Sequence, residues 1–291
     1  MINTIPHLKN NPKLEKQYLL KQNVVYSTET GVELKMSLFL PWALGAENVE
    51  HEKLPLIVFV QGSAWTTPDF DFETPQLSAV AREGFVIATV GHRDTSLGHP
   101  FPAFLQDVKC AIRYLRAHAE EYGIDPERVV IWGTSSGGNT SLLVGLSCDE
   151  ESYKTGEYAE LSDSVNAVVA CFPPTDILAL TAAYIETPHG QELKRAWAGS
   201  VDSEIWQSVA REMSPVNHVE EGKKYPPILM LNGTADPVVP HTQMESLYEK
   251  LCAVNAEVSA YYVDGAEHEG TFWTEEVRDI ILSFIKKHSG V

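Results

Sequence analysis

The chain has 291 residues, which is enough for one large α/β domain with a full hydrophobic core. Hydrophobic residues make up 44% and charged residues 21%, as in an ordinary globular protein. The formal net charge of −18 argues against nucleic acid, anionic membranes and polyanionic substrates, because a strongly negative protein repels them. Neutral or cationic small molecules remain as the expected ligands.

Neither a signal peptide nor a membrane span is expected. The N-terminal residues contain no apolar segment of the signal-peptide kind, and no apolar run approaches the length of a bilayer. We therefore expect a cytoplasmic protein, unless a leader was removed. Widely spaced cysteines without a C-x-x-C pair are expected to be buried free thiols, and a disulfide is the less favoured alternative. These cysteines are Cys110, Cys148, Cys171 and Cys252.

Strands and helices are predicted to alternate along most of the chain. Residues 1–22 are polar and suggest an N-terminal arm or short helix outside the sheet, which could pack over the site. Loose alternation predicts antiparallel strands at 24–26 and 32–40. Apolar runs predict buried strands at 56–60, 85–90, 129–132, 165–172, 227–232 and 258–263. Helices are predicted at 76–83, 104–122, 241–254 and 274–288.

This alternation implies a mostly parallel central sheet with helices on both faces. Residues 173–225, which contain Tyr184, Trp197 and Trp206, fit none of the strands. We interpret them as a cap-like insertion over the carboxyl edge of the sheet, where ligands bind in such folds. Residues 1–291 are expected to form a single domain of this class.

The pattern G-x-S-x-G is filled by Gly133, Ser135 and Gly137, between an apolar run and a helix of small residues. At such a turn the serine takes a strained backbone conformation, and the flanking glycines leave room for the strand and helix to approach. Free N–H groups at the start of the helix, Ser136 first, would stabilise a negative oxygen. The pattern predicts a nucleophilic Ser135, and a plain Gly/Ser loop is the disfavoured alternative.

A serine hydroxyl needs a base, and the base needs an acid to orient it. Asp236 and His268 follow successive predicted buried strands, and this gives the chain order Ser, Asp, His. Asp236 could instead be only a turn or cap residue. Asp264 is the rival acid, but it lies too close in sequence to His268. Among the other histidines, His241 opens a helix and is expected to be a cap neighbour.

With these residues in place, the chain from about residue 32 to 288 resembles the α/β-hydrolase family. More narrowly, it is similar to the branch of hormone-sensitive-lipase-like carboxylesterases and bacterial feruloyl or acetyl-xylan esterases. In that branch the loop after an early buried strand reads His-Gly-Gly-x-Trp. The matching stretches here are Gln61-Gly62-Ser63-Ala64-Trp65, His99-Pro100-Phe101-Pro102-Ala103 with Asp107, Ser214-Pro215, and Gly265-Ala266-x-His268.

The resemblance implies the α/β-hydrolase fold and an oxyanion hole made by the N–H groups of Ser63, Ala64 and Ser136. Serine and alanine replace glycines in this loop, yet they keep the N–H groups on which an oxyanion hole depends. Gln61 replaces a histidine that braces the loop in the family, and an amide can do the same by hydrogen bonding. The residues expected on the substrate side are Gln61, Trp65 and His92.

The expected activity is that of a serine hydrolase on neutral carboxylic esters with short-chain, acetyl or hydroxycinnamoyl groups. Ser135 would attack the carbonyl, His268 would move the proton and Asp236 would hold the imidazole.

Metal-ligand spacings and phosphate or dinucleotide loops are absent from the sequence, so we expect neither a metal nor a cofactor. The expected partner is a small-molecule ester, and a homo-oligomer is left open. An amidase such as a formamidase, or an exopeptidase, is the alternative, and a non-catalytic binding protein is a more distant one.

Overall fold

One eight-stranded sheet forms the centre of the computed structural model, which describes residues 5–46 and 52–291. The strands are β1 (Tyr18–Ser27), β2 (Leu34–Pro41), β3 (Leu54–Val60), β4 (Val86–Val90), β5 (Ile124–Thr134), β6 (Ala167–Cys171), β7 (Ile228–Gly233) and β8 (Val258–Val263). Their spatial order is β1-β2-β4-β3-β5-β6-β7-β8. The pairs from β4 to β8 are parallel, and β1 and β2 form an antiparallel edge. The predicted mostly parallel sheet is confirmed.

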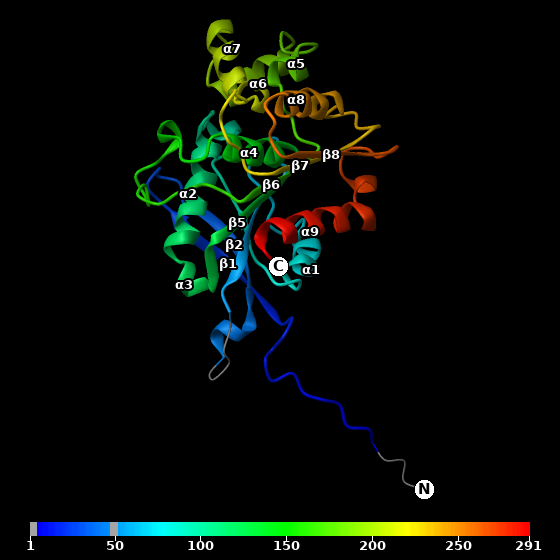
Figure 1. Cartoon of the computed structure of the whole chain (residues 1–291). Coiled ribbons are helices and arrows are strands. Elements are labelled where there is room, and N and C mark those ends of the chain that lie inside the picture. The colour runs from blue at the N-terminus through cyan, green and yellow to red at the C-terminus, as the bar shows by residue number, and fades with distance from the viewer. Residues whose placement is uncertain (1–4, 47–51) are drawn as a thin grey trace.

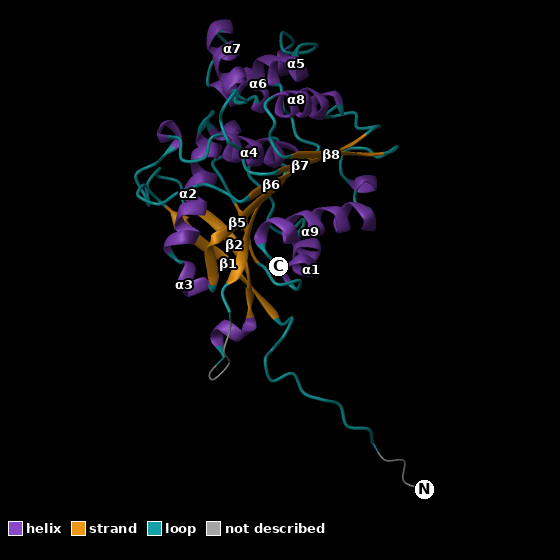
Figure 2. Ribbon diagram, viewed as in Figure 1, coloured by secondary structure: helices purple, strands orange, loops and turns teal. Residues whose placement is uncertain are grey.

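Helices cover both faces of this sheet (Figures 1 and 2). They are α1 (Thr74–Ala81), α2 (Ala103–Ala117), α3 (Ala119–Tyr122), α4 (Ser135–Leu146), α5 (Ile177–Thr181), α6 (Pro188–Ala198), α7 (Ser203–Glu212), α8 (Thr242–Ala253) and α9 (Glu275–Ser289). The predicted helix over 104–122 is divided between α2 and α3, because the backbone at His118 leaves helical geometry with φ −103° and ψ 20°.

Alternate side chains of the central strands belong to two different cores. In β3, Val58 and Val60 belong to the core that includes α2, α4 and α8, whereas Ile57 and Phe59 belong to the core that includes α1 and α9. Since successive side chains of a strand point to opposite faces, both faces of β3 require apolar residues. This explains the continuous apolar runs in the sequence.

The N-terminal arm differs from the expectation for residues 1–22. Strand β1 already begins at Tyr18, which pairs with Pro41, so the last part of the expected arm belongs to the sheet. Residues 13–18 border a groove together with Leu54, the first residue of β3. They therefore lie at the amino ends of the parallel strands, and the expectation that the arm packs over the site is wrong. Residues 1–4 lie outside the described part of the chain.

Two expectations about burial also need correction. Strand β8 was expected to be buried, but it is an edge strand, and Tyr261 and Tyr262 are 45% and 51% exposed. The cysteines are free, and Cys110 and Cys171 are buried as expected, whereas Cys148 is half-buried and Cys252 near the end of α8 is exposed. An amphipathic helix offers an exposed face even to an apolar residue.

Within residues 5–46 and 52–291, none of the helices combines the length and the apolar character that crossing a bilayer requires.

Residues 173–225, expected as an insertion, contain α5, α6 and α7 between β6 and β7. In Figure 1 these helices lie beyond the carboxyl ends of the strands, on the side away from the N-terminus. Trp197 of α6 and Trp206 of α7 are buried with their ring centroids 6.3 Å apart. Both side chains belong to the same apolar core as α2 and α4, so the segment is packed onto the rest of the domain.

The turn between β5 and α4 has a strained backbone and little free space. Ser135 has a φ of 51°, a left-handed conformation that is unfavourable for a residue with a side chain. A Cβ atom at Gly133 would lie 2.1 Å from the carbonyl oxygen of Gly137, and one at Gly137 would lie 2.0 Å from the carbonyl oxygen of Val60. Both glycines are therefore required by close backbone approach.

We expect Gly137→Ala to lower the free energy of unfolding by about 3 kcal/mol, because the new methyl group would push α4 away from β3. Urea unfolding measures the loss. Gly45→Ala is the matched control, since an added Cβ there meets nothing within 4 Å, and its effect should stay within about 0.5 kcal/mol. Equal effects of the two substitutions would contradict the close approach of α4 and β3.

Candidate active site

Three loops at the carboxyl ends of the strands bring Ser135, Asp236 and His268 together. Ser135 is the first residue of α4, directly after β5, and the other two follow β7 and β8. His268 Nε2 lies 3.0 Å from Ser135 Oγ, and His268 Nδ1 lies 2.7 Å from Asp236 Oδ2. The three residues singled out in the sequence thus form one continuous chain of hydrogen bonds.

Asp236 uses its two oxygens for different tasks. Oδ1 accepts the backbone N–H groups of Val238 and Val239 at 2.8 and 2.9 Å, and Oδ2 faces the imidazole of His268. The side chain of Asp236 is fully buried. Asp236 therefore is a turn residue, which was the alternative expected from the sequence, and it also contacts His268. The hydrogen bonds of the turn hold its carboxylate in place. The rival, Asp264, is exposed.

The contacts of His268 decide which of its nitrogens carries a proton. Because Asp236 offers only acceptor atoms as a carboxylate, Nδ1 donates to it and Nε2 is left to accept the hydroxyl proton of Ser135. The ring of Phe172 meets the imidazole edge-on with a centroid distance of 4.6 Å, which restricts its rotation. The base is thus oriented by a carboxylate on one side and an aromatic ring on another.

The loop after β3 is hydrogen-bonded directly to the turn between β5 and α4. The N–H of Gly62 donates to Thr134 Oγ1 and that of Ser63 to Ser136 Oγ, both at 2.9 Å. Of the three expected oxyanion donors, Ser63 thus already has a hydrogen-bond partner, and no sequence pattern indicates this contact. The N–H of Ser136, near the start of α4, has no acceptor within its helix.

The residues expected on the substrate side are all more than nine-tenths buried. Gln61 Oε1 accepts the N–H of Asp69, so this amide braces the loop as expected. Trp65 packs between the loop and the insertion, with its ring 4.8 Å from that of Trp197. His92 Nδ1 lies 2.9 Å from the carbonyl oxygen of Arg93, and burial lowers the pKa of this histidine. The structure gives all three packing contacts, and a contact with substrate stays a prediction.

Asp94 and Asn139 shape the site but were missed in the sequence. Asp94 accepts the N–H and hydroxyl groups of both Thr67 and Ser96, at 2.6 to 2.8 Å, and so holds the loop that continues from Trp65. The order Asp-Thr-Ser is a capping pattern that could have revealed it. Asn139 is a polar residue inside a helix of small residues, and this was its only signal.

Asn139 connects α4 to the segment just before α5 and to the residue just after α7. Its Nδ2 donates to the carbonyl oxygens of Pro174 and Met213 at 2.9 and 2.8 Å, and the residue is fully buried. Pro174 precedes α5 and Met213 follows α7. The position of the insertion is therefore fixed relative to Ser135.

In the part of the chain that the structure describes, no group of three or more His, Cys, Asp or Glu side chains is placed to hold a metal ion.

Comparison with known proteins identifies the family. The BD-FAE family model matches residues 44–251. The chain belongs to this family of α/β-hydrolase esterases. The resemblance and the α/β-hydrolase fold expected from the sequence are confirmed.

Individual proteins of known name or structure are similar to this chain in sequence or in fold. Esterase LipC of Mycobacterium tuberculosis is 28% identical over 260 residues, which are 87% of this chain and 60% of LipC. A solved structure described as a truncated carbohydrate esterase from gut microbiota has a TM-score of 0.78 and 25% identity, with 97% of this chain and 100% of that chain covered. Butyrate-bound esterase Est2 of Thermogutta terrifontis has a TM-score of 0.73 and 24% identity, with 93% and 94% covered. The chain spans only half to three-fifths of the mycobacterial relatives LipC, LipM and LipQ.

We expect Asp94→Asn to destabilise the protein at pH 7 and to have a much smaller effect at pH 3. Burial acts to raise the pKa of Asp94, but hydrogen bonds from Ser96 and Thr67 outweigh it and hold the pKa below its ordinary value. Because the pKa of Asp94 is lower in the folded than in the unfolded protein, its charge stabilises the fold at any pH above the unfolded-state pKa of about 3.9. This stabilisation is lost as the pH falls below that value and through the pKa of the folded state.

Urea unfolding of the wild type and of Asp94→Asn at both pH values measures this difference. Asp264→Asn serves as the control, because that carboxylate is exposed. A difference between wild type and Asp94→Asn that stays constant from pH 7 to pH 3 would contradict the role of the Asp94 charge.

Proposed function

We propose that the protein hydrolyses carboxylic esters, with Ser135 as the nucleophile, His268 as the general base and acid, and Asp236 as the residue that orients His268. The observation that carries this proposal is the chain of two hydrogen bonds, 3.0 and 2.7 Å long, that joins the three side chains. Membership of an esterase family supports the same reaction class.

In the first half of the reaction, Ser135 Oγ bonds to the carbonyl carbon while its proton passes to His268 Nε2. Collapse of the tetrahedral intermediate breaks the bond to the alcohol, which leaves with the proton from His268. In the second half, His268 takes a proton from water, the hydroxide attacks the acyl group, and the acid is released as Ser135 recovers its proton. Asp236 stabilises the imidazolium in both halves.

The N–H groups of Ser136 and Ala64 are the proposed donors to the oxyanion. Ala64 has a φ of 51°, which re-aims the backbone within the loop after β3. The N–H of Ser63 can join them only by leaving Ser136 Oγ, its partner at 2.9 Å. Loss of one such donor costs about 3 kcal/mol of transition-state stabilisation.

The proposed substrates are neutral acetyl or other short-chain esters of a hydroxylated alcohol such as a sugar, with hydroxycinnamoyl esters as the second choice. A groove of about 530 Å³ is lined by Ala64 and Thr66 of the loop after β3, by Thr95 and Ser96 of the loop after β4, and by residues of α6 such as Leu193. Its hydroxyl groups suit a polyhydroxylated group, and its apolar residues suit the carbon skeleton. The carbohydrate esterase among the similar structures supports this choice.

We expect Ser135→Ala to lower kcat for 4-nitrophenyl acetate by about 10⁴- to 10⁶-fold and to abolish labelling by a fluorophosphonate probe. Asp236→Asn should lower kcat by about 10⁴-fold, because the imidazole loses its orienting carboxylate. Asp264→Asn and Ser141→Ala are the matched controls and should keep kcat within about threefold. A folded wild-type protein that never reacts with the probe would refute the proposed activity.

A substrate panel tests the proposed ester class. We expect kcat/KM for 4-nitrophenyl acetate and butyrate to exceed that for the octanoate by at least about tenfold, which is the preference for short acyl chains proposed above. Acetylated xylose should be deacetylated, and methyl ferulate should react more slowly. The amide 4-nitroacetanilide is the control for reaction class, and faster turnover of the amide than of the ester would favour an amidase instead.

A further inference from the structure

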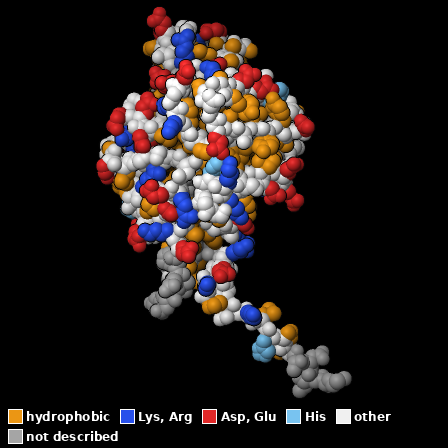
Figure 3. All heavy atoms as spheres, viewed as in Figure 1, with side chains coloured by type: hydrophobic (Ala, Val, Ile, Leu, Met, Phe, Trp, Pro, Cys, Tyr) orange, Lys and Arg blue, Asp and Glu red, His pale blue; other side chains and the backbone are white. Residues whose placement is uncertain are grey.

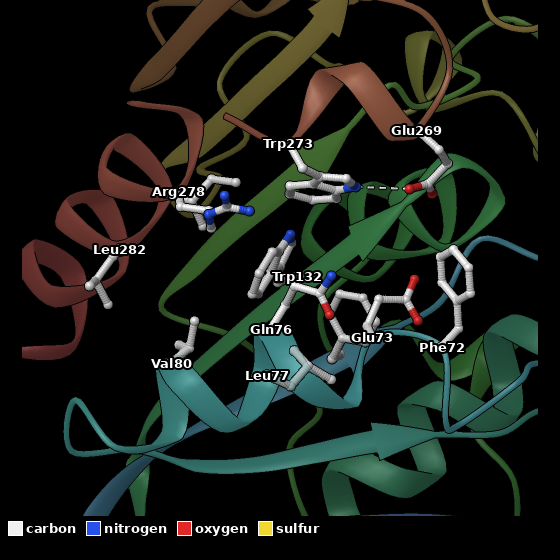
Figure 4. Close-up of a pocket in the computed structure, with 13 residues that line it drawn as sticks. Phe72, Glu73, Gln76, Leu77, Val80, Trp132, Glu269, Trp273, Arg278 and Leu282 are labelled. Atoms are coloured by element: carbon white, nitrogen blue, oxygen red, sulfur yellow. Dashed lines mark hydrogen bonds between the residues drawn. The ribbon is translucent and has the colours of Figure 1, made fainter. Parts of the chain in front are cut away.

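A cavity of about 250 Å³ lies between α1 and α9, on the face of the sheet opposite α2 and α4 (Figure 4). Phe72 and Glu73 border it just before α1, in the segment that continues from the loop after β3. Glu269 and Trp273 border it from the segment that follows His268. Ser135 is not among its lining residues. The cavity is thus bordered by two segments that continue from the candidate active site, one from the loop after β3 and one from His268.

Glu73 is a buried acid that forms no ion pair with any of the residues that the structure describes. It is only 7% exposed, and among the described residues its Oε1 atom finds no hydrogen-bond partner. Burial raises the pKa of Glu73 to about 8, and the negative charge of Glu269 adds to this, while a hydrogen bond with Gln61 acts in the opposite direction. A cation beside a buried carboxyl group of this kind stabilises its charged form further.

Aromatic rings form much of the cavity wall. The rings of Phe59 and Trp132 meet edge-on at 5.1 Å, and the indoles of Trp132 and Trp273 lie 6.3 Å apart. Trp273 Nε1 donates to Glu269 Oε2 at 2.8 Å, which fixes the second carboxylate at the cavity. Aromatic faces attract cations, and the attraction increases when the cation leaves water.

The charges lie at opposite ends of the cavity. In Figure 4, Glu73 and Glu269 lie together near the ring of Phe72, whereas Arg278 lies at the other end, and the two indoles stand between them. A ligand cation beside the two carboxylates would therefore be separated from Arg278. Acidic and basic side chains are both scattered over the face of the molecule seen in Figure 3, and the net charge of −18 favours the approach of cations.

We infer that this cavity is a second ligand site, separate from Ser135, for a small organic ammonium ion that carries an apolar or aromatic group. The ammonium group lies between Glu73 and Glu269, and the apolar group lies along Trp132 and the side chains of α1 such as Leu77. A volume of about 250 Å³ is below the range of roughly 300–1,000 Å³ that is typical for drug-sized ligands, so the ligand has about one ring. This inference is independent of the proposed ester hydrolysis.

The first test compares benzylamine, in its cationic form at pH 8, with benzyl alcohol as a neutral molecule of similar shape. Isothermal titration of the full chain is expected to show at least about tenfold tighter binding of the cation. The same affinity is expected for Ser135→Ala, because the cavity does not include that residue. Equal binding of the two molecules, or loss of binding in Ser135→Ala, would overturn the inference.

The second test uses the pH dependence of binding of benzyltrimethylammonium, whose charge is permanent. The affinity is expected to rise about tenfold per pH unit up to pH 8 and to level off above it, as Glu73 loses its proton. The charged groups that face Glu73 are Glu269 after β8, Asp69 in its own loop and Arg278 on α9 at the far end of the cavity. An affinity that does not change between pH 6 and pH 9 would contradict the role of Glu73.

Two substitutions locate the site. Glu73→Gln removes the charge with little change in shape and is expected to lower cation affinity at least about tenfold and to abolish its pH dependence. Gln76→Lys, one turn further along α1, would supply a tethered ammonium group and is expected to exclude the probe and raise the melting temperature. Unchanged cation binding in both variants would overturn the inference, and thermal unfolding confirms that each variant is folded.

Discussion

The close approach of α4 to β3 is the constraint on which the rest of the site depends. It requires glycine at 137, where a Cβ atom would lie 2.0 Å from the carbonyl oxygen of Val60, and it forces Ser135 into a left-handed turn with φ 51°. The same approach brings the loop after β3 against the nucleophile, since a Cβ at Gly62 would lie 2.7 Å from that of Ser135. The serine hydroxyl and the loop that faces it are thus positioned by a single contact between backbones.

Parallel strand order explains how distant residues meet at this turn. Asp236 and His268 follow β7 and β8, and because the strands are parallel, both loops leave the sheet at the edge where Ser135 lies. Local bonds then fix each side chain: backbone N–H groups hold Asp236, and Phe172 packs on His268. Precise placement of reacting groups by rigid neighbours is what acyl transfer requires. The cavity bordered by Glu73 lies between α1 and α9, on the face of the sheet opposite α4.

The sequence was sufficient for the strands, for the helices that cover the sheet and for bringing Ser135, Asp236 and His268 together, because apolar runs, the G-x-S-x-G pattern and the order of the loops are local signals. It did not predict α5, α6 and α7. It was insufficient where burial depends on distant packing. Glu73 stands in an acidic loop and becomes buried only because α9 and the segment after His268 close over it. The apolar pattern of β8 predicts a buried strand, although β8 lies at the edge of the sheet. The sequence of the loop after β3 does not indicate that the N–H of Ser63 donates to Ser136 Oγ.

The central claim is that Ser135 forms a covalent bond with the acyl group of an ester. Mass spectrometry of protein quenched in acid during turnover of 4-nitrophenyl butyrate tests it most directly. We expect a population of protein heavier by one butyryl group, with the added mass on the peptide that contains Ser135, and loss of this species in Ser135→Ala. Turnover of the ester without any acylated peptide, or acylation at another residue that accounts for the turnover, would contradict it.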